Sequence, residues 1–173
     1  MLKKHFKISE KVFVEFSNRS MFKSKMKMII LTGIILFGTV FAFNFKEGVL
    51  QSLGLGALLS LAYFVIVFGV MYISTPIIAK KIYYKNNINQ YNFDLTFTNE
   101  GITQNKDQIF PYSMFNKIIE TKLAFYFYLQ ERQIIVVGKD VLNDEEYNSL
   151  INIINDIKEI KQIKLLKSNK KED

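Results

Sequence analysis

Residues 28–45 read MIILTGIILFGTVFAFNF, a stretch without a single Asp, Glu, Lys or Arg. A second stretch, residues 48–79, also lacks charged residues. About 20 mainly apolar helical residues cross the hydrocarbon core of a bilayer, so each stretch is long enough to span a membrane. Pro76 removes a backbone donor and is expected to end or kink the second helix. The sequence therefore predicts two transmembrane spans, at residues 28–45 and 53–75.

The two spans are expected to form one helical hairpin over residues 28–79, because the connector at residues 46–52 is short. A secretory signal peptide is the competing interpretation of the first span. Signal peptides carry a shorter apolar region close to the N-terminus, whereas here 27 residues precede the span and a second span follows at once. This arrangement favours a membrane anchor.

Small residues recur every fourth position on the second span, at Ser52, Gly56 and Ser60, and on the first span at Gly38 and Ala42. Small residues at this spacing let two helix backbones approach closely. They are expected to pack the two spans against each other within the hairpin. The alternative is a homodimer formed through the face that carries Ser52, Gly56 and Ser60.

Most of the net charge of +7 precedes the first span, since residues 1–27 hold eight basic residues against Glu10 and Glu15. Four basic residues flank the start of the first span and three follow the second, whereas the connector holds only Lys46. Cytoplasmic flanks carry the excess of Lys and Arg, so both termini are predicted on the cytoplasmic side of the cell membrane. Arg19 and Arg132 are the only arginines, which argues against nucleic acid as a partner.

After the spans the hydrophobic pattern changes from continuous to alternating. In residues 91–98 (YNFDLTFT), Tyr91, Phe93, Leu95 and Phe97 alternate with polar residues, which is typical of a half-buried strand. Gly101 follows in a turn, where glycine tolerates positive φ. Five further short strands are predicted at residues 102–105, 108–110, 115–121, 124–129 and 133–137. Short strands at this spacing indicate an antiparallel meander.

A helix is predicted after the meander. Asn143 suits an N-cap, and Glu146 three residues later completes a capping box. The apolar residues then recur at helical spacing: Tyr147, Leu150, Ile151, Ile154 and Ile157. Asp140, Asp144, Glu145 and Glu146 could be imagined as a metal site, but the preference of helix N-termini for acidic residues explains them without a metal. Residues 167–173 form a charged tail.

Three motifs in this part resemble the YcxB-like proteins of bacteria: residues 97–102 (FTNEGI), 110–113 (FPYS) and 117–121 (KIIET). That family shows an F-T-x-x-G-I turn, an aromatic-Pro-Trp-Ser segment and a K-I-x-E-T strand, followed by an aromatic strand, a hydrophobic strand and a C-terminal helix. Residues 8–13 followed by two spans also resemble the family's layout. The resemblance covers most of the chain. Each motif alone is only moderately specific, but the motifs occur in the order and at the spacing of the family.

Two residues depart from the family pattern. Tyr112 stands where the family usually has Trp, and Gly138 stands where a Pro often precedes the lysine. Both positions are interpreted as structural. The resemblance implies a cytoplasmic β domain similar to a pleckstrin-homology (PH) barrel, capped by the C-terminal helix. It implies no known reaction and brings no catalytic residues.

The segment before the first span has two interpretations. Phe6, Ile8, Val12, Val14 and Phe16 fit one strand by alternation, which Glu10 interrupts. The preferred interpretation is a strand at residues 4–8, Ser9 as an N-cap, and a helix along the inner membrane surface. A PH-like barrel has seven strands, so residues 4–8 are expected to pair with an edge of the C-terminal sheet. The alternative is a six-stranded sheet with a free N-terminal arm.

The chain is thus predicted to be an α+β membrane protein with four parts: an N-terminal segment (1–27), the transmembrane hairpin (28–79), a YcxB-like, PH-like domain (86–166) and the tail (167–173). Cysteine is absent and His5 is the only histidine, so catalytic, metal-binding and cofactor-binding residues are all predicted to be none. The predicted function is a membrane-anchored interaction module for a protein, peptide or lipid-headgroup partner. The alternative, a subunit of an oligomeric channel or transporter, is less favoured because the spans lack ionisable residues.

Overall fold

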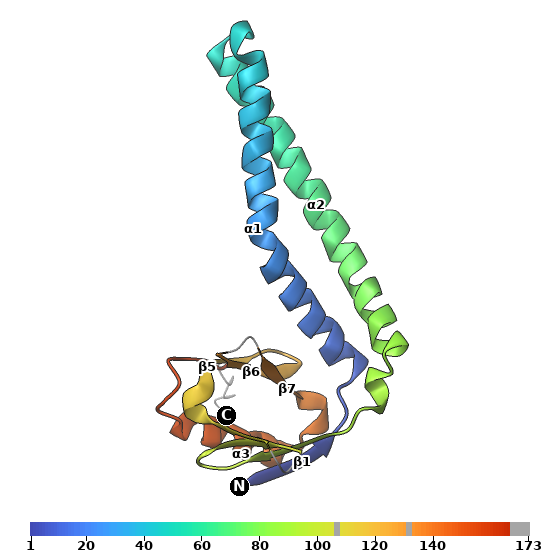
Figure 1. The fold of residues 1–173 in the computed structure, drawn as a ribbon, viewed down its shortest axis with the longest axis vertical. Coiled ribbons are helices and arrows are strands. Elements are labelled where there is room, and N and C mark those ends of the chain that lie inside the picture. Colours follow the sequence, from blue (N-terminus) through green and yellow to red (C-terminus); the bar gives the residue numbers. More distant parts are fainter. Residues whose placement is uncertain (106–107, 131–132, 167–173) are drawn as a thin grey trace, which may run out of the picture. The chain divides into compact units, whose positions relative to one another are not determined.

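The computed structural model describes residues 1–105, 108–130 and 133–166 (Figure 1). These residues divide into two compact units. The first unit consists of Met1–Phe13 and the described residues from Tyr83 onward, and it holds all the strands. The second unit, Val14–Ile82, is a pair of long helices. The expected charged tail, residues 167–173, lies outside the described residues.

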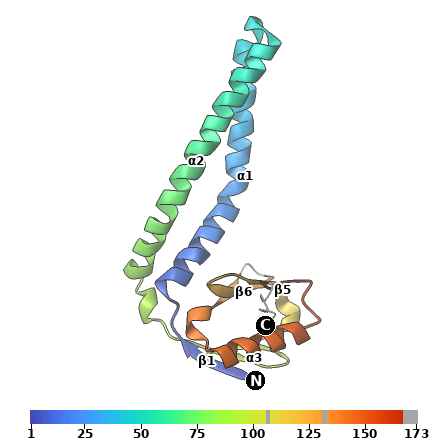
Figure 2. The same cartoon turned by 180° about the vertical axis from the view of Figure 1, so that it is seen from behind.

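The helical unit is an antiparallel hairpin of α1 (Glu10–Asn44) and α2 (Val49–Lys85), joined through the short 3-10 helix η1 (Phe45–Glu47) (Figure 2). Pro76 lies inside α2, and the helix continues past it to Lys85. Residues 10–27 are the first part of α1, so the expected surface helix is not a separate element.

The interface between α1 and α2 uses the small residues of α2. The Ser60 hydroxyl donates to the Gly33 carbonyl at 3.4 Å, and Ser52 donates to the Asn44 carbonyl at 2.5 Å. Gly56 lies against the Phe37 ring, where an added Cβ would stand 3.2 Å from Cδ2. The interpretation of packing within the hairpin is therefore correct for Ser52, Gly56 and Ser60.

The small residues expected on the first span do not take part in this interface as predicted. An added Cβ at Gly38 would meet nothing within 4 Å. Gly33 instead faces α2, where an added Cβ would run into the Phe64 ring. The difference arises because the two helices interdigitate glycine against phenylalanine, whereas the prediction matched small residues with each other.

Both helices are long and apolar enough to cross a membrane, and only 11% of the most apolar stretch of each is buried. A core helix of a water-soluble protein with this composition would be mostly buried. The exposed side chains include Ile35 and Val65, which are 59% and 65% exposed. The helical unit thus presents a continuous apolar surface that requires an apolar cover.

The first sheet of the other unit has the order β1-β2-β3-β4 and is antiparallel throughout. Its strands are β1 (Leu2–Phe6), β2 (Phe93–Phe97), β3 (Gly101–Gln104) and β4 (Gln108–Pro111). Leu95 and Phe97 are buried as the alternation predicts, whereas Tyr91 precedes the strand and is 60% exposed.

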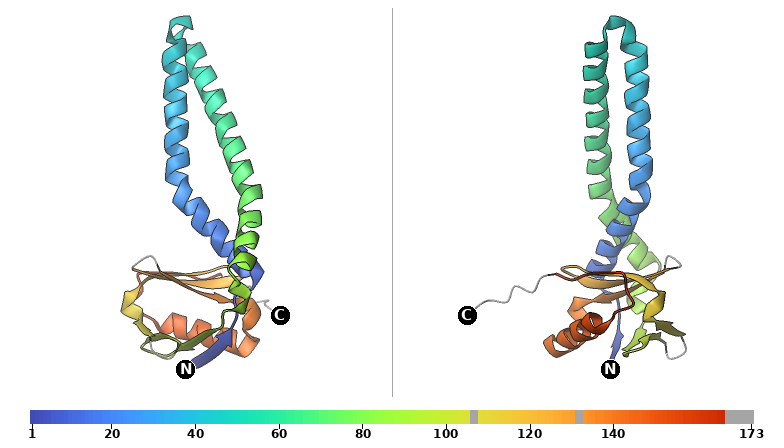
Figure 3. Two further views of the ribbon diagram at one scale, coloured as in Figure 1. Left: turned by 45° about the vertical axis from the view of Figure 1, so that its right-hand side comes forward. Right: turned by 90° about the vertical axis from the view of Figure 1, so that its left-hand side faces the viewer.

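The second sheet forms a separate layer of the β unit (Figure 3), and its order is β7-β6-β5-β8. Its strands are β5 (Phe115–Glu120), β6 (Ala124–Leu129), β7 (Ile134–Gly138) and β8 (Gln162–Lys164). All six strands predicted between residues 91 and 137 are present, with their ends shifted by a few residues. β8 was not predicted, and it pairs with β5 in parallel, so the unit is not a purely antiparallel meander.

The C-terminal helix α3 (Asp144–Asp156) begins with the predicted capping box. The Asn143 side chain accepts from the Glu146 amide at 2.8 Å, and the Glu146 carboxylate accepts from the Asn143 amide at 2.9 Å. Leu150 and Ile154 are buried in one apolar core with the inner faces of both sheets. That core contains Leu2, Phe6, Leu95, Phe97, Ile102, Phe110, Tyr112, Phe115, Ile118, Phe125, Phe127, Leu129, Ile135, Val137, Leu150, Ile154, Ile157 and Ile160.

The predicted pairing of the N-terminal segment with the C-terminal sheet is confirmed. β1 pairs antiparallel with β2 over five residue pairs, from Leu2 opposite Phe97 to Phe6 opposite Phe93. The strand occupies residues 2–6 instead of the expected 4–8, because Leu2 and Phe6 are the side chains that reach the core. Ser9 then precedes α1, and its hydroxyl accepts from the Val12 amide at 3.5 Å.

The reason for a glycine at position 101 differs from the prediction. Gly101 does not have positive φ. An added Cβ would run into the backbone of Phe110 on the neighbouring strand β4, 2.9 Å from its carbonyl carbon. Gly101 is therefore required by the close approach of two strands.

Candidate functional site

The most distinctive side chain of the β unit is Glu120, the last residue of β5. Alternation along β5 places it on the same face as Ile118, the face that points into the core. Its side chain is completely buried. A buried carboxylate is strongly destabilising unless it is paired and hydrogen-bonded, so its partners define the site.

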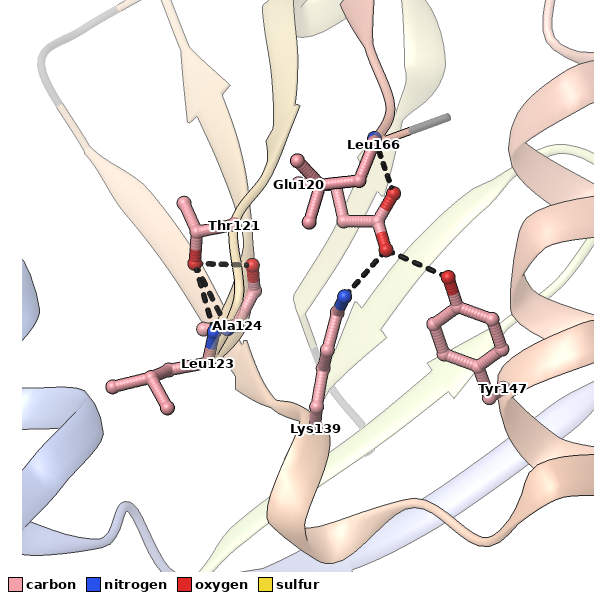
Figure 4. A network of polar contacts seen from close by, with 7 residues as sticks. All are labelled: Glu120, Thr121, Leu123, Ala124, Lys139, Tyr147 and Leu166. Atoms are coloured by element: carbon pink, nitrogen blue, oxygen red, sulfur yellow. Dashed lines mark hydrogen bonds and ion pairs between the residues drawn. The ribbon is translucent and has the colours of Figure 1, made fainter. Parts of the chain in front are cut away.

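Two partners reach one oxygen of Glu120 from two different elements (Figure 4). Lys139, the first residue of the 3-10 helix η4 (Lys139–Val141), donates from Nζ to Oε1 at 2.5 Å. The Tyr147 hydroxyl, on α3, donates to the same oxygen at 2.7 Å. The Lys139 ammonium also lies 5.4 Å from the Phe125 ring centre and 5.2 Å from that of Tyr147, within the range of a cation–π interaction.

The other oxygen of Glu120 binds the C-terminal segment. The backbone amide of Leu166 donates to Oε2 at 2.7 Å (Figure 4). Leu166 follows β8, so this contact lies at the end of the described chain. Glu120 thereby joins four elements: β5, η4, α3 and the segment that contains β8. We call Glu120, Lys139, Tyr147 and the Leu166 amide the Glu120 cluster.

The hydrogen bonds of the cluster control its protonation. Burial alone raises the pKa of the Glu120 carboxyl, but the hydrogen bonds from Lys139, Tyr147 and the Leu166 amide, with the charge of Lys139, outweigh burial and hold that pKa below its ordinary value. Burial, with the adjacent carboxylate, raises the pKa of Tyr147 to about 12. At neutral pH Glu120 is therefore a carboxylate and Tyr147 is a neutral phenol.

The cluster is built from the motifs that carried the family resemblance. Glu120 and Thr121 are the last two residues of the KIIET motif, and Lys139 is the lysine that follows Gly138. Thr121 closes the adjacent turn, because its hydroxyl donates to the Ala124 carbonyl at 3.0 Å and accepts from the Leu123 and Ala124 amides (Figure 4). In the KIIET motif, Glu120 thus makes the ion pair and Thr121 stabilises the turn.

Tyr112, the residue after β4, also joins two of the motifs. It is buried, and its hydroxyl donates to the Thr98 carbonyl at 2.9 Å, which ties the FPYS motif to the turn of the FTNEGI motif. Burial raises the pKa of Tyr112 to about 12. A Tyr in place of the family's Trp therefore still supplies a ring and a polar donor, in keeping with the structural interpretation.

The geometry of the Glu120 cluster suits binding and positioning. Both carboxylate oxygens are occupied and the side chain is inaccessible, so a substrate cannot meet it without displacing a partner. The Leu166 contact is made by a backbone amide, which any residue except proline supplies. The arrangement can therefore hold an extended chain against β5 with little dependence on which side chain stands at the position of Leu166.

Three of the four acidic residues considered for a metal lie at the start of α3, as predicted, whereas Asp140 lies in η4. Asp144 and Glu145 occupy the first turn, and Glu146 completes the capping box. Glu146 also accepts from Lys4 of β1 at 2.6 Å, a hydrogen bond that, with that from the Asn143 amide, lowers the pKa of its carboxyl. Across residues 1–105, 108–130 and 133–166, no group of three His, Cys, Asp or Glu side chains could hold a metal ion.

Sequence reasoning missed the Glu120 cluster because the partners of Glu120 are 19 to 46 positions away along the chain. Lys139 does begin a short turn, but its ammonium points inward to Glu120. One signal was available: Glu120 follows Ile118 at the two-residue spacing of the inward face of a strand, which predicts a buried carboxylate in need of a partner. Arg132 lies outside the described residues.

A family model described as YcxB-like protein matches residues 97–154, which confirms the resemblance over that part of the chain. The match begins in β2 and ends in α3, so it includes Glu120, Lys139 and Tyr147. β1, both long helices and β8 lie outside it. No curated protein and no solved structure matches the chain.

Proposed function

We propose that this chain, whose residues 97–154 are YcxB-like, is a membrane-anchored interaction module. The helical hairpin would hold a PH-like β domain at the cytoplasmic face of the cell membrane, where that domain binds a partner protein. The observation that carries the proposal is the pair of long apolar helices, 11% buried, that joins directly to the β unit at both of its ends.

The charge distribution supports the orientation. Seven basic residues flank the ends of the hairpin that join the β unit, against Lys46 in the connector, and by the positive-inside rule this asymmetry supports a cytoplasmic location of both termini. The strand order supports the PH-like assignment, because seven consecutive antiparallel strands divide into two sheets and a capping helix follows. β8 is an addition to that pattern.

Thiol labelling tests the orientation, because the chain has no cysteine of its own. In intact cells a membrane-impermeant maleimide is expected to label Lys46→Cys. Lys161→Cys should react only after the membrane is permeabilised. Labelling of Lys161→Cys in intact cells would contradict the proposed topology.

A matched pair of substitutions tests the membrane anchor. Val65 in α2 and Ile109 in β4 are equally exposed, at 65% and 67%. Val65→Lys should oppose insertion by about 2.5–3.5 kcal/mol, because a lysine would lie at mid-membrane. Ile109→Lys should change little, since water already surrounds that position. Equal carbonate-resistant membrane association of the two variants would refute the assigned span.

Site-specific photo-crosslinking of the full chain in membranes tests the interaction role. A crosslinking residue at Ile109, Lys122 or Lys161 samples three exposed places on the β unit, and Lys46 in the hairpin connector is the control. A discrete protein adduct from at least one position of the β unit, absent from Lys46, is expected. Adducts to lipid alone would replace the protein partner with a lipid surface.

A further inference from the structure

The C-terminal segment, residues 161–166, is attached to the β unit differently from every other described strand. Its strand β8 pairs with β5 over three residues, Gln162 to Lys164, and Ile163 lies opposite Ile118. This pairing is parallel, whereas all other strand pairs in the described part of the chain are antiparallel. β8 is also the shortest of the strands.

Few side chains hold the segment in place. Ile163 and Leu165 are partly buried against the core, whereas Gln162, Lys164 and Leu166 are exposed. The remaining contacts are backbone contacts: the β5 ladder and the Leu166 amide on Glu120. The edge of β5 therefore recognises an extended backbone with an apolar residue at every second position, as in peptide recognition by strand addition.

The chain that precedes the segment is held in the core by its own side chains. No regular structure connects α3 to β8, and Ile157 and Ile160 stay buried in the core. The chain is thus held in the core as far as Ile160, and residues 161–166 follow as the part that another strand could replace. An empty site is unfavourable, however, because it would expose the edge of β5 and remove a donor from the Glu120 carboxylate. These two facts favour exchange of one strand for another.

We propose that the edge of β5 is a binding site for an extended segment of a partner protein, which residues 161–166 occupy in cis until that segment replaces them. The partner segment has apolar residues at the places of Ile163 and Leu165, followed by a residue other than proline whose amide takes the place of the Leu166 amide on Glu120. This inference rests on the proposed interaction function and names the surface and the ligand class.

A switchable lock in the full chain tests the proposal. Ile119 and Lys164 are opposite each other on β5 and β8, so Ile119→Cys with Lys164→Cys places the only two thiols of the chain side by side. The probe is a fluorescent peptide with the sequence of residues 158–168, added to the chain in nanodiscs. The reduced chain is expected to bind the peptide, and the intramolecular disulfide should weaken binding at least about tenfold.

Truncation after Lys161 provides the second measurement. A tethered segment competes at an effective concentration of the order of millimolar, so its removal should tighten peptide binding by about tenfold or more. A control peptide in which the residues matching Ile163 and Leu165 are both Asp should not bind. Near-UV circular dichroism checks that each protein is folded.

Three results would overturn the proposal. Equal peptide binding by the oxidised and reduced chains would place the peptide elsewhere, and absence of binding to the folded reduced chain would show that the site does not exchange. A disulfide between two chains would make a second copy the occupant. Each of these results leaves the photo-crosslinked adducts of the β unit unaffected, so the proposed function is tested separately.

Discussion

The two ends of the described chain both add an edge strand to the β unit, but they are held in different ways. β1 pairs with β2 over five residues and buries Leu2 and Phe6, with exposed fractions of 8% and 5%. β8 pairs with β5 over three residues and buries no side chain completely. Both strands lie outside the segment that matches the YcxB-like family model.

The difference follows from what each strand brings to the interior. β1 supplies two apolar side chains to the common core, and its Lys4 bridges to Glu146 on α3. β8 supplies mainly backbone groups, and the segment after it adds the Leu166 amide on the Glu120 carboxylate, which other residues already neutralise. Burial of apolar area dominates stability, so β1 is expected to be integral to the fold and β8 to be replaceable.

The largest expected effect separates the two strands directly. Phe6→Ala should lower the free energy of unfolding by about 3–5 kcal/mol, because it removes a buried aromatic ring that stacks on Phe93. Ile163→Ala, the matched change in β8, should cost about 1 kcal/mol, since that side chain is only partly buried. Urea titration of the solubilised chain, followed by near-UV circular dichroism, measures both. Similar losses would remove the distinction between the strands.

Neutralising the Glu120 carboxylate removes the negative charge that binds Lys139 and accepts from the Leu166 amide after β8. Glu120→Gln should lower the free energy of unfolding by about 3 kcal/mol, because it leaves the ammonium of Lys139 without its buried counter-charge. Glu146→Gln is the control at the β1 end, where the ion pair is partly exposed, and the loss should be smaller. The same urea titration compares them. A larger loss for Glu146→Gln would show that the Lys4–Glu146 ion pair stabilises the fold more than the Lys139–Glu120 ion pair does.

Acid should weaken both ends, because each depends on a carboxylate whose pKa is lowered in the folded chain. The unfolded carboxyls take up protons first as the pH falls, so the stabilisation is complete above their ordinary pKa of about 4.3. It decreases as the pH falls below that value and is lost below the folded pKa. In Glu120→Gln the acid dependence should be shallower, and the remainder reports Glu146. An unchanged pH profile of the free energy of unfolding would exclude Glu120 as a contributor.

The smallest expected effect is a gain. Gly138 has φ −67°, which proline can adopt, and the Lys139 amide donates to the carbonyl of Leu123, the residue before β6, so the Gly138 amide points away from that strand. Gly138→Pro should raise the free energy of unfolding by about 0.4–1 kcal/mol by restricting the unfolded chain. The Asp140 side chain must turn aside to make room, and Val12 Cγ2, 3.1 Å from an added Cβ, must shift slightly. A loss of stability would show that the backbone before Lys139 has no room for the ring.

Local patterns in the sequence predicted most of the elements. Alternation located β2, the short spacing of strand-like segments located the next five strands, and the capping box located the start of α3. The pairing of the N-terminal segment was also predicted, because a PH-like barrel has seven strands and only six were predicted after the spans. These predictions succeeded because the periodicity and the cap chemistry are properties of neighbouring residues.

The sequence by itself determined the two apolar helices, the strands β1 to β7 and the cap of α3, since each of these elements depends on contacts within a few residues. Only the tertiary structure decided that Lys139 and Tyr147 meet Glu120, that Gly101 makes room for Phe110, and that β8 returns to β5. Those contacts join residues that are separated along the chain by 9 to 46 positions. No local pattern specifies such a pairing, because a buried charge or a strand edge can be satisfied by any partner that the folded chain brings within reach.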